Sequence, residues 1–113
     1  MSISISVTLN TAELERIANQ LDVRKHEVGR KIGPDFEASA KAHSRVDTGA
    51  MRSAFMVSYP GGDVIARLSN DIEYTKYNEF GTYKMAAQPM MIPAIEEVTG
   101  LVYDPNTWKI LFT

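Results

Sequence analysis

The segment FMVSYPGGDVIARL at residues 55–68 decides the fold class. Apolar side chains occupy alternate positions on each side of a Pro-Gly-Gly-Asp centre, first Phe55, Val57 and Tyr59 and then Val64, Ala66 and Leu68. A period of two is the spacing of one face of a β-strand, and paired glycines favour a tight turn. The segment therefore predicts a β-hairpin.

The N-terminal segment predicts a strand followed by a helix. Serine and threonine alternate with the apolar residues Ile3, Ile5, Val7 and Leu9, a pattern typical of a strand with one buried face. Its Ser/Thr face permits a position at the edge of a sheet. Asn10 or Thr11 can cap the next helix, and Glu13 completes a capping box with Asn10. The apolar residues that follow recur at the spacing of one helix face: Leu14, Ile17, Ala18 and Leu21.

Residues 23–44 predict a second helical stretch whose apolar stripe is Val28, Ile32, Phe36 and Ala40. Pro34 follows Gly33 and removes the hydrogen bond to the carbonyl of Arg30, so either the helix kinks there or two helices meet. A short helical turn is expected at residues 49–53, and Asp47 and Thr48 can cap its first amides. Arg52 can reach back to Asp47 in an exposed pair that contributes under ~1 kcal/mol.

The segment from Ile72 to Phe80 predicts a short helix that ends at Gly81. Its aromatic residues Tyr74, Tyr77 and Phe80 recur every three positions and are expected to pack over the sheet. Residues 82–89 have no period and predict a loop.

Pro89 and Pro93 suit the entry of a last helix that runs to about Val98 and ends at Gly100. Residues 108–112 predict a final strand, which we expect to pair within the domain, with pairing to a neighbouring subunit as the alternative. Together the elements predict an α+β fold: a small antiparallel sheet with a central hairpin packed against two or three helices.

The composition is typical of a globular protein, and we expect residues 1–113 to form one domain. Hydrophobic residues make up 44% and charged residues 23%, which excludes wholesale disorder. There is no cysteine, so disulfides, thiolate metal sites and thiol catalysis are excluded. No signal-peptide pattern is present, and no apolar run approaches the ~20 residues of a membrane span. We therefore expect the protein to stay in the cytoplasm unless it is assembled into a larger structure.

No residue pattern predicts an enzyme. His26 and His43 are 17 residues apart, about five turns of a helix, which is too far to share a metal ion. His43 lies near Ser44 and Asp47, which suggests a hydrolase site, but no nucleophile elbow accompanies them. Adjacent Glu96 and Glu97 point about 100° apart on a helix and form no catalytic dyad. We expect no catalytic residue, no cofactor and no metal site.

Two short blocks resemble a phage signature. The first is VDTGAMRS at residues 46–53, and the second is NEFGT at residues 78–82, which continues to AQPMMIPA at residues 87–94. In this order, separated by the hairpin and with Tyr74 and Tyr77 before the second block, they resemble the gene-product-ten-like tail-component family of long-tailed (HK-type, lambdoid) bacteriophages. The resemblance covers residues from about Ala12 to Val98.

The resemblance implies a structural virion protein at the head-tail junction: a neck, tail-completion or minor tail component. Such a protein forms a ring that adapts the head connector to the tail tube. The implied partners are other copies of the chain, head connector or head-closure proteins, and tail tube or tail terminator proteins; no membrane is implied, and DNA is touched only as it passes through the channel.

The loop at 82–89 and the terminal strands are expected to order on contact with neighbouring subunits. The candidate contact residues are Asp47, Thr48, Arg52, Glu79, Phe80, Gly81, Lys84, Met85 and Trp108. For the first six, a role in folding is favoured at least as much as a role in contact.

An alternative function comes from the uneven charge. Six of the 12 Lys and Arg residues but only three of the 14 Asp and Glu residues lie in the segment from Arg24 to Arg45. A basic stripe on this helix suggests a small nucleic-acid-binding regulator that would use Arg24, Lys25, Arg30, Lys31, Lys41 and Arg45. The same asymmetry also suits a ring of identical subunits, because opposite charges meet at each head-to-tail contact.

Overall fold

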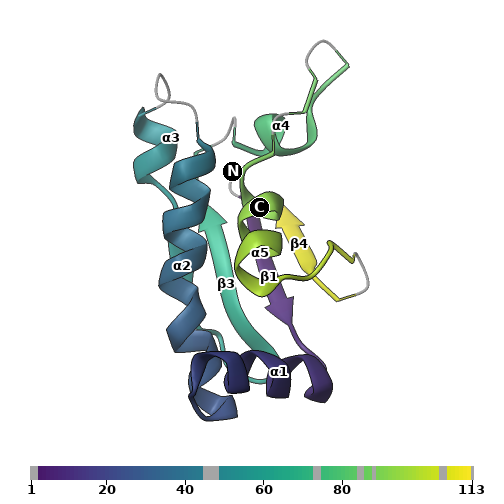
Figure 1. The fold of residues 1–113 in the computed structure, drawn as a ribbon. Coiled ribbons are helices and arrows are strands. Elements are labelled where there is room, and N and C mark those ends of the chain that lie inside the picture. Colours follow the sequence, from purple (N-terminus) through teal and green to yellow (C-terminus); the bar gives the residue numbers. More distant parts are fainter. Residues whose placement is uncertain are drawn as a thin grey trace.

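The computed structural model describes residues 3–44, 49–72, 75–83, 86–87, 89–104 and 107–112. Within them, helices pack on one face of a four-stranded antiparallel sheet (Figure 1). This confirms the predicted α+β class. The strands are β1 (Ile3–Thr8), β2 (Met56–Ser58), β3 (Val64–Asn70) and β4 (Lys109–Phe112). The helices are α1 (Thr11–Leu21), the 3-10 turn η1 (Lys25–Glu27), α2 (Val28–His43), α3 (Gly49–Ser53), α4 (Thr75–Phe80) and α5 (Met91–Thr99).

The strand order is β2-β3-β1-β4, so β1 has a neighbour on each side. The edge position that its Ser/Thr face permits is therefore not the one that this strand occupies. Its Ser/Thr face shows which face of the sheet meets solvent, but face polarity does not determine how many strands flank it. The predicted hairpin is confirmed as β2 and β3, and the C-terminal strand pairs within the domain as expected, with Ile5 of β1 opposite Ile110 of β4.

Helix α1 begins with the predicted capping box. The side chain of Asn10 accepts a hydrogen bond from the Glu13 amide at 2.8 Å, and the Glu13 carboxylate accepts one from the Asn10 amide at 3.1 Å. These two bonds satisfy amides that have no acceptor inside the helix, and they fix the turn between β1 and α1.

Helix α2 runs unbroken through Pro34, so the alternative of two helices meeting there is wrong. It crosses the hairpin closely at two glycines. A Cβ on Gly29 would lie 2.2 Å from the carbonyl oxygen of Ile65, and one on Gly33 would lie 2.4 Å from the hydroxyl of Tyr59. The contact of Gly29 is with backbone, so this position requires glycine if α2 is to pack so closely on the sheet, whereas a side chain at position 33 would have to displace the side chains of Tyr59 and Val57.

The short helix α4 differs from its prediction in the face that it buries. Thr75 and Glu79 are buried, whereas Tyr77 is 39% exposed and Phe80 is 43% exposed. The expected packing of the aromatic side chains over the sheet is thus found in part, since the exposed Phe80 meets Phe112 of β4 while Tyr77 is exposed, and Tyr74 lies outside the described residues. Helix α4 ends as predicted, because Gly81 adopts φ 76° and its amide donates to the Tyr77 carbonyl at 2.7 Å.

The core lies between the sheet and helices α2 and α5. The inward row of β1 (Ile3, Ile5, Val7) belongs to one core with the predicted apolar stripe of α2, which packs mainly on β3 and β2, and α5 lies beside α2 over the same sheet face (Figure 1). Helix α5 contributes Met91, Ala94 and Ile95 to this core and ends at Gly100, which has φ 72°. The fold therefore leaves both outer strands, β2 and β4, at free edges among the described residues.

Candidate assembly interface

Glu79 connects the two parts of the second block of the phage resemblance, residues 78–82 and residues 87–94. Glu79 is 2% exposed, and its carboxylate accepts three backbone hydrogen bonds, from the amides of Met90 at 2.9 Å, Met91 at 2.8 Å and Ile92 at 3.0 Å. These amides open α5, where a helix has no acceptors of its own. A negative charge is also favourable at this positive end of the helix dipole. Glu79 thus acts as the N-terminal cap of α5, although it lies on α4.

Asn70, the last residue of β3, brings the first block, which contains Met51, to the same place. Its side-chain amide donates to the Met51 carbonyl at 2.8 Å, and its oxygen accepts from the Ile72 amide and the Thr75 hydroxyl, both at 3.0 Å. Asn78 also reaches the Met51 sulfur at 3.9 Å. We call this set of bonds around Met51, Asn70, Thr75 and Glu79 the block cluster. It holds α3, α4 and the start of α5 together.

The structure separates the predicted contact residues into two groups. Trp108 is 2% exposed and packs against Tyr103 with ring centres 5.6 Å apart, so Trp108, like Glu79, is not available to a neighbouring subunit. Arg52 and Phe80 are exposed, and Gly81 is half-buried. The remaining candidates, Asp47, Thr48, Lys84 and Met85, lie outside the described residues, as does the predicted cap of α3.

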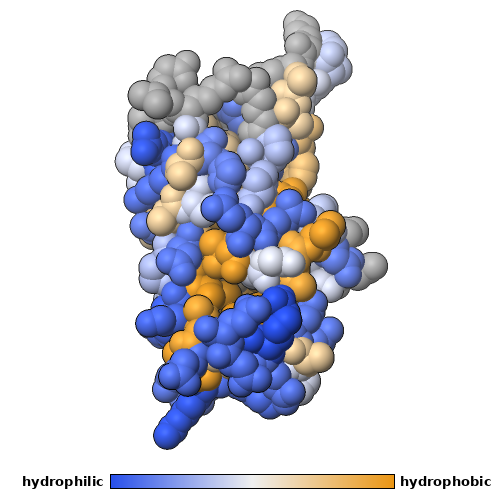
Figure 2. Space-filling view, viewed as in Figure 1, coloured by the Kyte–Doolittle hydropathy of each residue, from blue (hydrophilic) through white to orange (hydrophobic). Residues whose placement is uncertain are grey.

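Large apolar side chains are exposed at both sheet edges. On β4, Leu111 is 55% and Phe112 is 51% exposed, and the ring of Phe112 meets that of Phe80 edge-to-face at 5.7 Å. On β2, at the opposite edge, Met56 is 61% exposed. In Figure 2, apolar surface lies beside β4 and extends toward α4, while the outer surfaces of α1 and α2 are mainly hydrophilic. Exposed apolar groups on an unpaired strand are a typical feature of an association surface.

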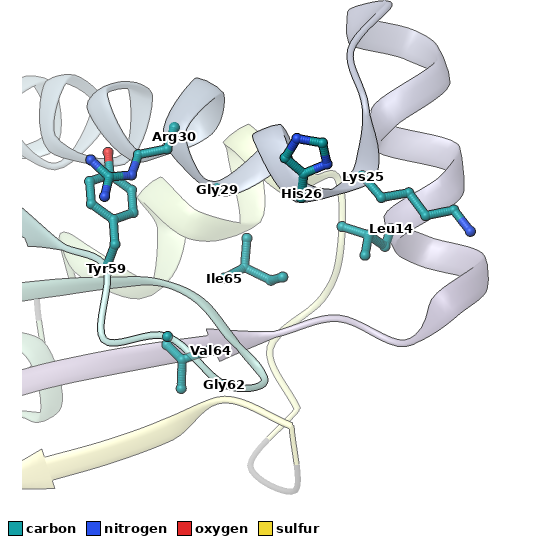
Figure 3. A pocket seen from close by; sticks show the side chains of 10 residues that line it. Leu14, Lys25, His26, Gly29, Arg30, Tyr59, Gly62, Val64 and Ile65 are labelled. Carbon is teal, nitrogen blue, oxygen red and sulfur yellow. The ribbon is translucent and has the colours of Figure 1, made fainter.

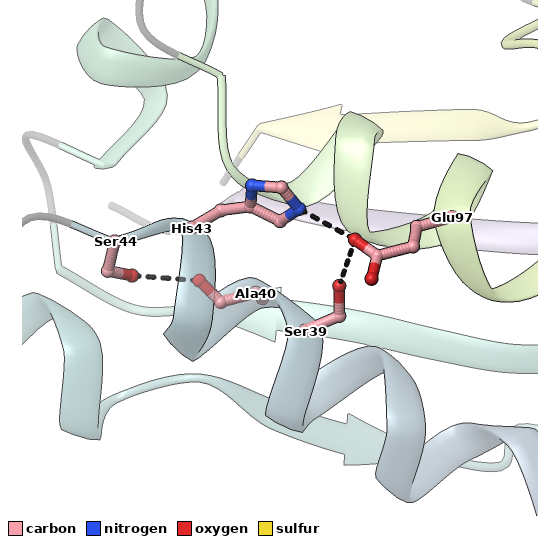
Figure 4. A network of polar contacts seen from close by, with 5 residues as sticks. All are labelled: Ser39, Ala40, His43, Ser44 and Glu97. Carbon is pink, nitrogen blue, oxygen red and sulfur yellow. Dashed lines mark hydrogen bonds and ion pairs between the residues drawn. The ribbon is translucent and has the colours of Figure 1, made fainter.

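His43 takes part in a contact between helices. Glu97 of α5 lies between two side chains of α2 and accepts hydrogen bonds from Ser39 at 3.1 Å and from the His43 ring at 2.9 Å (Figure 4). These bonds lower the pKa of Glu97 below its usual 4.5. Ser44 donates instead to the Ala40 carbonyl at 2.9 Å. Neither serine is bonded to the histidine, so the described residues form no nucleophile-base pair here.

A cavity of about 500 Å³ lies between the start of α2 and the hairpin turn (Figure 3). Two of the cations that line it already have partners. Lys25 pairs with Glu15 at 2.7 Å, and the guanidinium of Arg30 lies 4.2 Å from the ring centre of Tyr59. Among the described residues, no buried side-chain nitrogen or oxygen lacks a hydrogen-bond partner. The cavity therefore presents no buried polar group that awaits a ligand.

The basic stripe is partly neutralised in the folded chain. Besides Lys25 and Arg30, Lys41 pairs with Glu37 one turn away at 3.3 Å. Phosphate binding would have to compete with these contacts. Arg45, another member of the stripe, lies outside the described residues.

The described part of the chain contains no cluster of three or more His, Asp or Glu side chains that could hold a metal ion. None of its helices is long and apolar enough to span a membrane.

Two features of the interface were missed at the level of sequence. Asn70 gave no signal beyond its place at the end of a strand pattern. Glu79 caps a helix that begins 12 residues after it, whereas sequence rules for capping search within one turn.

Comparisons of the chain with protein-family models, with curated proteins and with solved structures found no match.

Proposed function

We propose that the protein is a structural adapter of a bacteriophage head-tail junction, where copies of the chain form a ring between the head connector and the tail tube. The block cluster is the observation that carries this proposal. The segments of the resemblance meet there through hydrogen bonds that the side chains of Asn70 and Glu79 make with the backbone of Met51 and of residues 90–92. Sequence blocks that join in one place in the fold give more specific support to the resemblance than the same residues would if they lay apart on the surface.

The exposed chemistry also favours a protein contact over catalysis. The two sheet edges carry the exposed apolar side chains of Met56, Leu111 and Phe112, whereas His43, on which the hydrolase alternative depends, bonds to an exposed glutamate. Such edges suit association with protein strands. The adapter remains our proposal in preference to the nucleic-acid regulator, because Lys25, Arg30 and Lys41 already have partners within the domain.

The test is to disrupt this gene alone in the phage or prophage that encodes it and to examine the lysate by electron microscopy. We expect filled heads separate from tails, or heads with defective tails, and we expect the wild-type chain supplied in trans to restore joined particles. Intact infectious particles after disruption would refute the proposal. In that case, salt-dependent binding of duplex DNA by the purified chain would favour the regulator.

A further inference from the structure

We propose that copies of this chain associate head to tail by strand pairing, with the β4 edge of one copy against the β2 edge of the next. The inference names the contact that the proposed ring would use, and it rests on the proposed function only for closure into a ring. The pairing itself follows from the topology, the register and the exposed side chains of the two edges.

The strand directions permit this contact. Every neighbouring pair in the order β2-β3-β1-β4 is antiparallel, so β2 and β4 run in opposite directions. When a second copy in the same orientation continues the sheet, β4 of the first copy therefore meets β2 of the second as an antiparallel neighbour. A contact between two different edges is heterologous, and such contacts generate rings or filaments.

The register brings the exposed apolar side chains together. Met56 is opposite Ser69, Ser69 is opposite Ser4, and Ser4 is opposite Leu111, so all four lie in one cross-strand row. This row ends in an exposed apolar residue at both edges of the sheet. If this row continues into the next copy, Leu111 of one copy lies beside Met56 of the next, at the spacing at which cross-strand side chains contact each other.

The next outward-facing row supports the same register. It links Ser58, Arg67, Ser6 and Lys109 in order across the sheet. Lys109 of one copy then faces the small polar Ser58 of the next. The register therefore puts no like charges opposite each other in either outward row.

Coverage of both edges favours the head-to-tail contact over a two-fold contact. Pairing unlike edges covers the exposed apolar side chains of β4 and of β2 together. A β4-β4 dimer would leave Met56 uncovered, and it would carry the exposed, positively charged Lys109 on both sides of the contact.

Disulfide trapping tests this register directly, because the chain contains no cysteine. In the double variant Met56→Cys/Leu111→Cys, the two thiols of one copy lie three strand spacings apart, about 14 Å, and cannot bond to each other. Mild oxidation of the purified protein at high concentration should give a ladder of linked oligomers. The second in-register pair, Ser58→Cys/Lys109→Cys, should give the same ladder.

Matched controls separate the possible geometries. Each single-cysteine variant should stay monomeric, and Met56→Cys/Lys109→Cys, which is two residues out of register, should link roughly tenfold less. All substituted side chains are on strands at the surface, and Trp108 fluorescence confirms that each variant is folded. Linking by Leu111→Cys alone would show a two-fold β4 contact and overturn the proposal, as would the absence of linking in both in-register pairs.

Failure of the pairing can be distinguished from failure of the adapter function. A ladder together with intact particles after gene disruption would leave the pairing standing and refute the junction role. Separated heads and tails without any ladder would support the junction role and refute this contact.

Discussion

Substitution of Glu79 by alanine is predicted to be strongly destabilising, because it removes the acceptor for three amides at the start of α5. The amides of Met90 and Met91 are buried, and a buried donor left unpaired costs about 1–3 kcal/mol. Loss of the negative charge at the helix N-terminus adds about 0.5–2 kcal/mol. Partial access of water offsets some of this cost, so we expect a total of about 3–6 kcal/mol, against about 5–15 kcal/mol for the stability of a typical domain.

Glu79→Gln is the informative companion variant. Its amide oxygen can still accept from Met90 and Met91, but its NH₂ group faces the Ile92 amide, so we expect about half of the alanine effect. Glu37→Ala, which removes a half-buried pair with a lysine one turn away, is the control and should cost under about 0.5 kcal/mol.

The assay is urea unfolding followed by the fluorescence of the single tryptophan, Trp108, which is buried. The free energies of unfolding should rank wild type and Glu37→Ala together, then Glu79→Gln, then Glu79→Ala. A loss below about 1 kcal/mol for Glu79→Ala would refute the capping role.

Three further predictions concern packing, the block cluster and pH. Gly29→Ala should cost about 2–4 kcal/mol in urea unfolding, since its methyl group would meet the backbone oxygen of Ile65; an unchanged midpoint would contradict this close crossing. Asn70→Ala should cost about 2–4 kcal/mol because it leaves several buried groups unpaired, and a loss under about 0.5 kcal/mol would argue against the cluster. Because hydrogen bonds to His43 and Ser39 lower the pKa of Glu97, its carboxylate stabilises the fold above pH 4.5, and this contribution is lost as the pH falls through the lowered pKa. The Tm difference between wild type and Glu97→Gln should therefore shrink in acid; a difference that does not change with pH would contradict the assignment.

Local patterns were sufficient to predict most of the elements. The alternation at residues 3–9, the capping box at Asn10 and the glycine-centred hairpin each depend on neighbours within a few residues, and all three appear in the structure. Gly81 and Gly100 end helices as predicted because a positive φ is a local requirement. The α+β class followed from the order of these elements.

The errors concern properties that depend on the rest of the fold. The neighbours of β1 could not be read from its own alternation, because a C-terminal strand more than 100 residues away supplies one of them. The exposed face of α4 was predicted only in part because a buried carboxylate, Glu79, turns toward α5, and this interaction outweighs the burial of Tyr77 and Phe80. Pro34 stays inside a continuous helix, since the packing of α2 on the sheet and α5 offsets one lost hydrogen bond.

The most direct test of the adapter role is cryo-electron microscopy of the head-tail junction in purified particles of the encoding phage, combined with mass spectrometry of their proteins. We predict a closed ring in the junction whose subunit density accommodates the four-stranded sheet with α2 and α5 on one face. A junction accounted for fully by other proteins, in particles that contain no copy of this chain, would contradict the account.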